Sequence, residues 1–251
     1  ATSLMNGQHV GVISPYGTGK TALREIVRRD LGDHQGFALA YLENADNTTS
    51  RQLYELVGRA ALEDGYSLDP VDFSQMRDGL PWATDELKRG VRQLVERAEA
   101  DNKTIVLLVD EIEDFPEDLL PTLQTAGDVG VRLFLMGTPR GKERLENLRD
   151  TLDSRVKWHD GIKPFELEHI AEYIARSLAY FRGDEYNDDY PIDPFTDDAV
   201  QAIHERTGGN PREVRLECSD ALAKGAIYWA QRGRNDDFEI NRDIATATIK
   251  N

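Results

Sequence analysis

The sequence has few cysteines and no long apolar runs. Cys218 is the one cysteine among 251 residues, which excludes an internal disulfide framework and favours a reducing compartment. No apolar run approaches the roughly 18 residues that a membrane-spanning helix needs, so no membrane partner is expected. The opening residues, Ala1-Thr2-Ser3, lack the basic and apolar segments of a secretory signal peptide. We therefore expect a cytoplasmic protein.

Positive charge is scarce as well. Lys and Arg number 30 against 46 Asp and Glu, the formal net charge is −16, and arginine outnumbers lysine. This acidic, lysine-poor composition resembles that of proteins from salt-loving archaea. Acidity normally argues against nucleic acid binding, because the neutralisation of phosphates drives that binding. In molar salt the Debye length is about 3 Å and this argument weakens, so double-stranded DNA stays open as a partner.

Strand-sized apolar runs alternate with helical periodicity in the first two thirds of the chain. The expected strands span residues 9–13, 36–42, 104–110 and 131–136, and the expected helices span 21–31, 50–62, 87–98 and 116–125. Residues 65–82, which hold Pro, Gly and Asp, predict a long loop. The run 104–110 is continuously apolar, as is typical of a central strand covered on both faces. The alternation predicts an α/β fold with a parallel, doubly wound sheet flanked by helices.

Helical periodicity alone follows residue 164. The expected helices are 167–181, 194–206, 211–231 and 240–249, with an acidic, solvated loop at 183–193. We therefore divide the chain into an α/β domain at residues 1–164 and a small all-helical domain at residues 165–251.

A glycine-rich segment follows the first expected strand and opens the first helix. Glycines let backbone N–H groups approach phosphates closely, and the helix N-terminus adds the positive end of its dipole. Lys20 is placed to reach the β and γ phosphates of ATP, and the Thr21 hydroxyl to ligate Mg²⁺. The full pattern has glycine where Ser14 stands, a departure that affects mainly the entry turn. The expected nucleotide-binding residues are Ser14, Pro15, Tyr16, Gly17, Thr18, Gly19, Lys20, Thr21 and Ala22.

Two carboxylates end the central strand. Asp110 and Glu111 directly follow the apolar run 105–109. The carboxyl ends of parallel strands face the ligand crevice of such a sheet. Asp110 can hold Mg²⁺ there, and Glu111 can orient and deprotonate the attacking water, whereas the alternative is that both cap the next helix. Glu113 and Asp114 are interpreted as solvated charges at the start of that helix.

The phosphate loop and the acidic strand end form a Walker A and Walker B pair, and with them the chain resembles the AAA+ superfamily. Thr138 ends the strand 131–136, where that family has its sensor 1 residue. Residues 207–213 (Thr-Gly-Gly-Asn-Pro-Arg-Glu) resemble the sensor 2 motif, which starts a lid helix. The resemblance implies an ATPase that uses ATP and Mg²⁺. It further implies that Arg212 contacts the γ phosphate and that residues 165–251 form the lid.

An arginine finger is also implied by this resemblance. Residues 152–156 (Leu-Asp-Ser-Arg-Val), ahead of Ile-Lys-Pro-Phe at 162–165, resemble the stretch around the family's finger and assign that role to Arg155. Arg149 and Arg144 are alternatives, and an intramolecular salt bridge is the structural alternative for Arg155. Because a finger completes the site of a neighbouring subunit, a homo-oligomer or an assembly with related AAA+ subunits is expected.

The sensor 2 motif points to the branch that holds origin-recognition initiators, transposition helpers and secretion-associated ATPases. Two features depart from the family: the lead before the first strand is short, where a longer one helps form the adenine pocket, and no segment after the lid resembles the winged-helix domain of initiators. Three functions are open. The first is an ATPase that assembles on ATP and acts with DNA or a DNA-bound complex. The others are a regulatory switch ATPase with protein partners and an assembly component that retains an ATPase fold.

Overall fold

The computed structural model describes residues 2–43, 45–46, 48–68, 71–73, 76, 79–161, 163–234 and 238–247. It divides the chain into two compact units. The first comprises Ala1–Tyr16 and Lys20–Gly161, and the second comprises Gly17–Gly19 and Ile162–Asn251.

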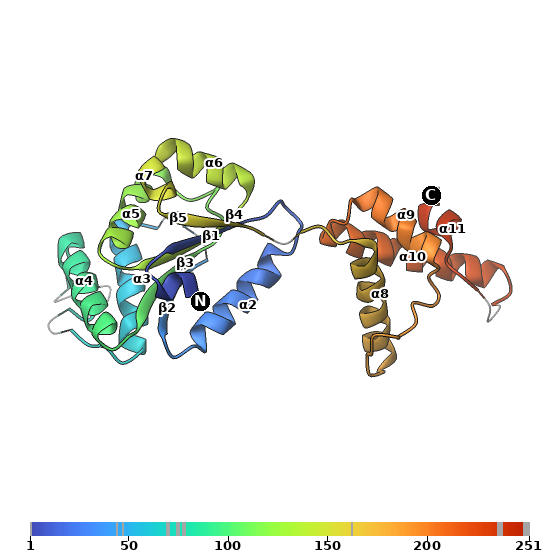
Figure 1. Ribbon diagram of the computed structural model, residues 1–251, viewed down its shortest axis with the longest axis horizontal. Helices are drawn as coiled ribbons and strands as arrows, with labels where there is room; N and C mark the ends of the chain where they lie inside the picture. Colours follow the sequence, from blue (N-terminus) through green and yellow to red (C-terminus); the bar gives the residue numbers. More distant parts are fainter. Residues whose placement is uncertain are drawn as a thin grey trace. The chain divides into compact units, whose positions relative to one another are not determined.

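The first unit is built on a five-stranded sheet in the order β2-β3-β4-β1-β5 (Figure 1). Its strands are β1 (His9–Ile13), β2 (Phe37–Leu42), β3 (Thr104–Val109), β4 (Arg132–Gly137) and β5 (Val156–Asp160). Every pairing is parallel. The predicted central strand, β3, lies between β2 and β4, and five of its six residues are buried.

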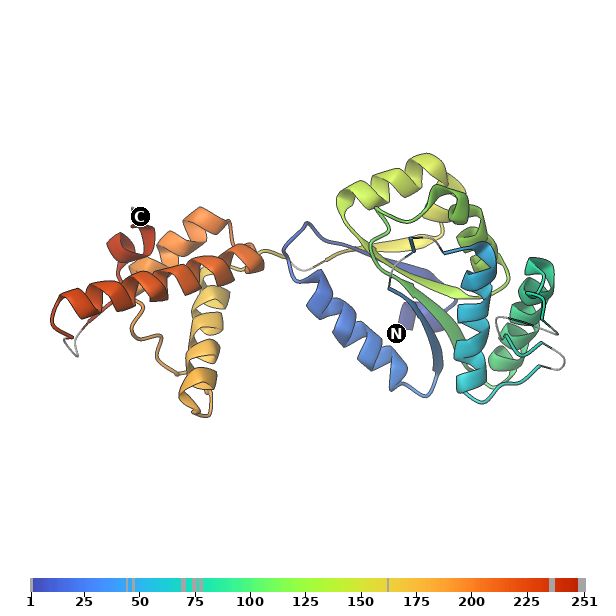
Figure 2. The same cartoon turned by 180° about the vertical axis from the view of Figure 1, so that it is seen from behind.

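Helices cover both faces of this sheet (Figures 1 and 2). Alternate residues of each strand point to opposite faces, so one apolar cluster joins the strands to α1 and α2, and another joins them to α3, α4 and α5. This arrangement confirms the predicted parallel, doubly wound α/β fold. The helices are α1 (Thr2–Met5), α2 (Lys20–Gly32), α3 (Ser50–Glu63), α4 (Thr84–Ala100), the 3₁₀ turn η1 (Glu117–Leu119), α5 (Leu120–Asp128), α6 (Pro139–Leu148) and α7 (Asp150–Asp153).

The edge strand β5 and the helices α6 and α7 were not predicted. The sequence of β5 is Val-Lys-Trp-His-Asp, and of these residues Val156 alone is buried. β5 pairs with β1 alone, and because most of its residues are exposed it carries no apolar run by which it could be recognised. The expected loop at 65–82 has no helix or strand in its described part, and residues 69, 70, 74, 75, 77 and 78 lie outside the described residues.

The second unit contains α8 (Leu167–Arg182), α9 (Asp197–Thr207), α10 (Pro211–Gln231) and α11 (Arg242–Thr246), as expected for a helical region. Its core gathers Ile170, Val200 and Val214 from three of these helices. The helix expected from residue 194 begins later, because Phe195 forms a bridge with Ile240 and Thr196 is extended. The expected last helix reaches to 249, and residues 248–251 lie outside the described part of the chain.

Candidate functional site

The glycine-rich loop connects β1 to α2. The Ser14 N–H donates to the Gly137 carbonyl at the end of β4 (3.0 Å), which ties the loop to the carboxyl edge of the sheet. Gly17 and Gly19 have φ values of 81° and 94°, a region that glycine enters without steric cost. Lys20 is the first residue of α2, so the loop leads directly into a helix N-terminus, where unpaired N–H groups favour an anion.

Ser14 departs from the expected glycine, and the fold accommodates it through another glycine. Ser14 is fully buried. A Cβ atom at Gly161 would lie 1.5 Å from the Ser14 Oγ atom, and the Gly161 N–H donates to the Ile13 carbonyl (2.6 Å). Gly161, just after β5, therefore provides the space in which the Ser14 side chain lies.

The end of β3 carries the two predicted carboxylates in different environments. Asp110 is buried and accepts from the Arg24 guanidinium (3.4 Å), whereas Glu111 is exposed. The φ value of Glu111 is 54°, a strained conformation for a residue with a side chain. Its N–H donates to the Asp110 Oδ1 atom (2.9 Å). Sequence reasoning missed Arg24, although Lys20 and Arg24 are four residues apart and so lie on the same face of α2.

The interpretation of Glu113 as a solvated charge is wrong. Its side chain is 3 % exposed and forms an ion pair with the Lys20 ammonium (3.2 Å). Its second carboxyl oxygen accepts from the Thr138 N–H (3.0 Å). Burial alone would raise the pKa of Glu113, but the N–H groups of Thr138 and Glu113 itself and the Lys20 ammonium outweigh it and hold this pKa below its ordinary value.

Thr138 lies where β4 meets α6, as predicted from the end of the apolar run. It is buried, and its hydroxyl accepts from the Gly141 N–H (3.4 Å) as the N-cap of α6. Through Glu113, the structure thus brings together the start of α2, the segment after β3 and the end of β4.

An acidic hollow of about 300 Å³ opens beside the end of β3. Apart from Ala45, those of its lining residues that the structure describes are all acidic: Glu43, Asp46, Asp110, Glu111 and Asp114. Several carboxylates at close quarters favour a cationic occupant. Carboxylate and hydroxyl oxygens of the kind that Asp110 and Thr21 supply are the donors that Mg²⁺ prefers, and Thr21 is exposed in the first turn of α2. These donors fit a magnesium ion held together with phosphate oxygens.

The three candidate arginine fingers have different contacts. Arg155 is 51 % exposed in its side chain and forms an ion pair with Asp128. Arg144 donates to the Phe115 carbonyl (2.7 Å), which holds it inside its own subunit. Arg149 is half-buried between α6 and α7. Arg155 is therefore the most exposed of the three, although it also has the intramolecular partner that the alternative interpretation required.

In the second unit, most residues of the 207–213 motif have local structural roles. Gly208 ends α9 with a φ value of 56°. Gly209, with φ at 74°, accepts from the Phe165 N–H (2.7 Å). The Asn210 side chain accepts from the first backbone N–H groups of α10, and Pro211 occupies its first position. The exposed Arg212 side chain is not needed for this turn.

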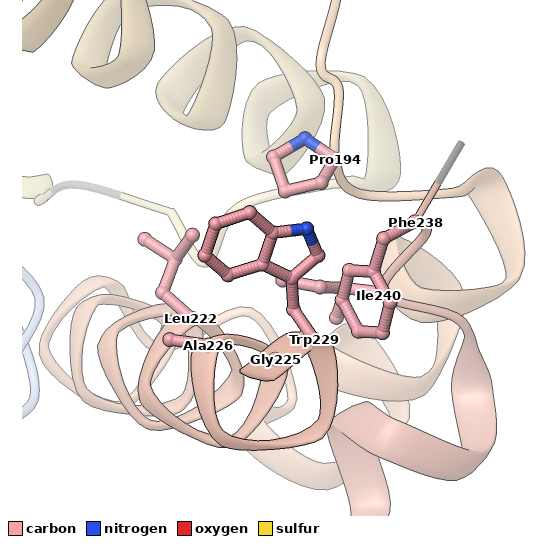
Figure 3. Close-up of a pocket in the computed structure, with 7 residues that line it drawn as sticks. All are labelled: Pro194, Leu222, Gly225, Ala226, Trp229, Phe238 and Ile240. Carbon is pink, nitrogen blue, oxygen red and sulfur yellow. The ribbon is translucent and has the colours of Figure 1, made fainter. Parts of the chain in front are cut away.

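An apolar pocket of about 370 Å³ lies in the second unit (Figure 3). Trp229 and Leu222 of α10 line it together with Pro194, Phe238 and Ile240. No predicted site residue is among its lining residues. Among the residues that the structure describes, no helix combines the length and the apolar character that a bilayer crossing requires.

A parallel α/β sheet with acidic strand ends, whose first strand continues through a glycine-rich loop into a helix N-terminus, is typical of the P-loop class of nucleotide-binding proteins. Within that class the chain belongs to the AAA domain family, whose model matches residues 5–145. A curated relative, an uncharacterized HTH-type transcriptional regulator of Methanocaldococcus jannaschii, is 23% identical over 146 residues. The match covers 55% of this chain and 34% of the relative, so the chain spans about a third of the relative's length.

Solved structures with a similar fold include archaeal Cdc6 and ORC proteins. Cdc6p of Pyrobaculum aerophilum has a TM-score of 0.50 and 17% identity, and the match covers 93% of this chain and 59% of that one. The ORC2 protein of Aeropyrum pernix in its ADP form has a TM-score of 0.56 and 15% identity, with 97% and 63% covered. At these identities the likeness concerns the fold, an AAA+ sheet followed by a helical region, and this chain covers less than two thirds of either protein.

Proposed function

We propose that this protein binds ATP with Mg²⁺ and hydrolyses it to ADP and phosphate. One observation carries the proposal: the phosphate-loop lysine Lys20, the buried Glu113 after β3 and the Thr138 N–H after β4 form one connected set of contacts. The three segments that an AAA+ site needs thus meet at the carboxyl edge of the sheet. Residues 1–164 are the proposed ATPase domain, and residues 165–251 the proposed lid.

Each predicted residue has a role in this site. The loop from Ser14 to Ala22 binds the phosphates through its N–H groups and Lys20, while Thr21 and Asp110 hold Mg²⁺. Glu111 orients and deprotonates the attacking water. Thr138 lies between the γ phosphate and that water. The ion supplies charge neutralisation on the phosphates.

Two arginines complete the proposed mechanism. Arg212, at the start of α10, contacts the γ phosphate. Its exposed side chain and the local turn roles of its neighbours support this assignment. Arg155 acts as a finger in the site of a neighbouring subunit, where the acidic hollow beside Glu111 offers a cation the complementary charge. Turnover then depends on assembly into a homo-oligomer or with related AAA+ subunits.

For the biological role we favour an ATPase that works in the cytoplasm on double-stranded DNA or a DNA-bound complex, in the initiator and transposition-helper branch. The similarity to a transcriptional regulator and to Cdc6 and ORC proteins supports this class. The net charge of −16 calls for high salt, as in a halophilic archaeon, because screening removes most of the repulsion from DNA. A regulatory switch with protein partners and an assembly component remain the alternative functions.

The test is steady-state ATP turnover in molar salt, measured against protein concentration with and without double-stranded DNA. The variant Lys20→Ala provides the background rate, because it should not bind ATP. Turnover per subunit that rises with concentration and with DNA supports the proposal. Tight nucleotide binding with no turnover under any condition favours the switch, and the absence of nucleotide binding rejects the proposed function.

A further inference from the structure

Glu113 is a buried carboxylate to which the proposed mechanism gives no role. It lies three residues beyond Asp110 and is excluded from water. A carboxylate without partners is too unstable to be buried, so the contacts of Glu113 must offset the loss of its hydration.

Those contacts connect separate segments of the site. The Oε1 atom pairs with Lys20 at the start of α2 (3.2 Å), and Oε2 accepts from the Thr138 N–H (3.0 Å). The hydroxyl of Tyr16 in the phosphate loop also donates to this carboxylate, and Glu113 is the main cause of the raised pKa of Tyr16. The same Lys20 ammonium lies 4.9 Å from the centre of the Tyr16 ring.

The chain leaves space for the carboxylate at the start of α6. A Cβ atom at Gly137 would lie 2.6 Å from the Glu113 Oε2 atom, and one at Gly141 would lie 3.0 Å from it. A negative charge at this helix N-terminus is also stabilised by the helix dipole. Gly137 and Gly141 thus leave space for the Glu113 carboxylate, and the Thr138 N–H donates a hydrogen bond to it.

We propose that Glu113 is a positioning residue. It pairs with Lys20 when ATP is absent, releases Lys20 to the phosphates when ATP binds, and transmits this exchange to Thr138 and α6. The inference rests on the proposed ATP binding. The triphosphate carries more negative charge than one carboxylate, so Lys20 turns from Glu113 to the phosphates when ATP enters. Glu113 then keeps the Thr138 N–H as its partner. In sequence, α6 is followed by Arg149 and, after α7, by Arg155. A shift of α6 on ATP binding therefore affects the proposed subunit contact.

The variant Glu113→Gln tests this exchange. It keeps the side-chain length and an oxygen that can accept from Thr138, but it removes the charge that binds Lys20. Lys20 then has no ion pair to give up, and the affinity for ATP should rise about five- to tenfold. Glu117→Gln is the control, since it removes an exposed carboxylate four residues away in η1 and should change the affinity less than about twofold.

Hydrogen exchange provides a second measurement, which uses the wild-type protein. Saturating ATP should change the exchange of the amides at 138–145, and Glu113→Gln should reduce that change. If Glu113 were merely structural, its replacement would lower both the affinity for ATP and the stability. The proposed exchange predicts instead that the affinity for ATP rises. Weaker or unchanged ATP binding by Glu113→Gln overturns the proposal. It is also overturned if ATP does not change the hydrogen exchange of the amides at 138–145 in the wild type.

A double-mutant cycle separates a failure of this inference from a failure of the proposed function. Lys20→Met, Glu113→Gln and the double variant are unfolded in urea without nucleotide. If the two residues are paired, the double variant loses less in midpoint than the two single variants together. Additive losses reject the pair and the exchange, whatever the protein binds. Absence of ATP binding by the wild type rejects the proposed function, and with it the exchange.

Discussion

The carboxyl edge of the sheet and the turn at 207–212 both contain a predicted motif, but they are held together differently. At the sheet edge, Lys20 and Glu113 are 93 residues apart in sequence and form one ion pair. In the turn, Asn210 accepts from the N–H groups of residues two and three positions later. The first motif is thus completed by distant residues and the second largely by its own neighbours.

This difference explains what a sequence motif can reveal. The conformation of a turn can be predicted from its own sequence, because glycines at positive φ, an N-cap and a proline act within a few residues. A catalytic edge depends on which strands lie side by side, and that follows from the sheet order. Each region can therefore be tested by the kind of change to which it should be sensitive.

The largest effect is expected at the sheet edge, for Glu111→Gln. If Glu111 is the general base, turnover should fall about 10³-fold while ATP affinity stays within about threefold, because an amide cannot take the proton. Single-turnover hydrolysis and equilibrium nucleotide binding measure the two quantities. Glu117→Gln, an exposed change in η1, is the control and should leave both unchanged. Persistent turnover in Glu111→Gln removes the assignment.

In the turn, Gly209→Ala should have the next largest effect, on stability. A Cβ atom there would lie 2.1 Å from the Phe165 carbonyl oxygen, at a φ value of 74°. The free energy of unfolding should fall by about 3 kcal/mol or more, since both backbone strain and a clash arise. Gly183→Ala is the matched control: φ is 76°, nothing lies within 4 Å, and the loss should be about 1 kcal/mol. Urea unfolding followed by Trp229 fluorescence measures both, and equal losses contradict the prediction.

The fold was largely predictable because buried strands and helix faces carry apolar periodicity. Four of the five strands appear as apolar runs, and β3 was predicted to be central. The strand β5 was not predicted because Val156 is its only buried residue, and α6 was not predicted because Leu145 is its only buried large apolar residue. Periodicity reveals an element only where the core covers it.

The site was predictable where the chemistry follows a local pattern. Ser14 and Lys20, at the two ends of the phosphate loop, lie at the expected edge of the sheet with Asp110, Glu111 and Thr138, while their catalytic roles stay predictions. The contacts of Glu113 and Arg24 could not be predicted, because their partners come from other elements. The three-residue spacing of Asp110 and Glu113 indicates only that both residues lie close to the end of β3.

A pH titration should distinguish the two units, with an effect similar to or smaller than that of Gly209→Ala. His9 of β1 is buried, and burial, with the nearby Arg132 and Arg155, lowers its pKa to about 4 from 6.5. The unfolded state then binds more protons between these values, so stability is full above pH 6.5 and is lost as the pH falls towards 4. The loss in the first unit reaches up to about 3 kcal/mol.

Denaturant unfolding at several pH values checks this prediction. Trp82 and Trp158 report on the first unit and Trp229 on the second, so single-tryptophan variants resolve the two. His9→Gln should remove most of the slope between pH 6.5 and 4, and His204→Gln, in the second unit, should leave it. If the unfolding free energy of His9→Gln still depends on pH as in the wild type, groups other than His9 cause the acid sensitivity.

The smallest effect on stability is expected for Arg155. Its ion pair with Asp128 is half-exposed, with side chains at 51 % and 46 %, so Arg155→Ala and Asp128→Ala should each cost less than about 1 kcal/mol. Their effects on turnover should differ. As a finger, Arg155 is needed in the neighbouring site, so Arg155→Ala should lose the rise of turnover with protein concentration, whereas Asp128→Ala frees the guanidinium and should keep it. If both variants lose that rise equally, the ion pair matters within the subunit, and the sheet edge is completed without a residue from its neighbour.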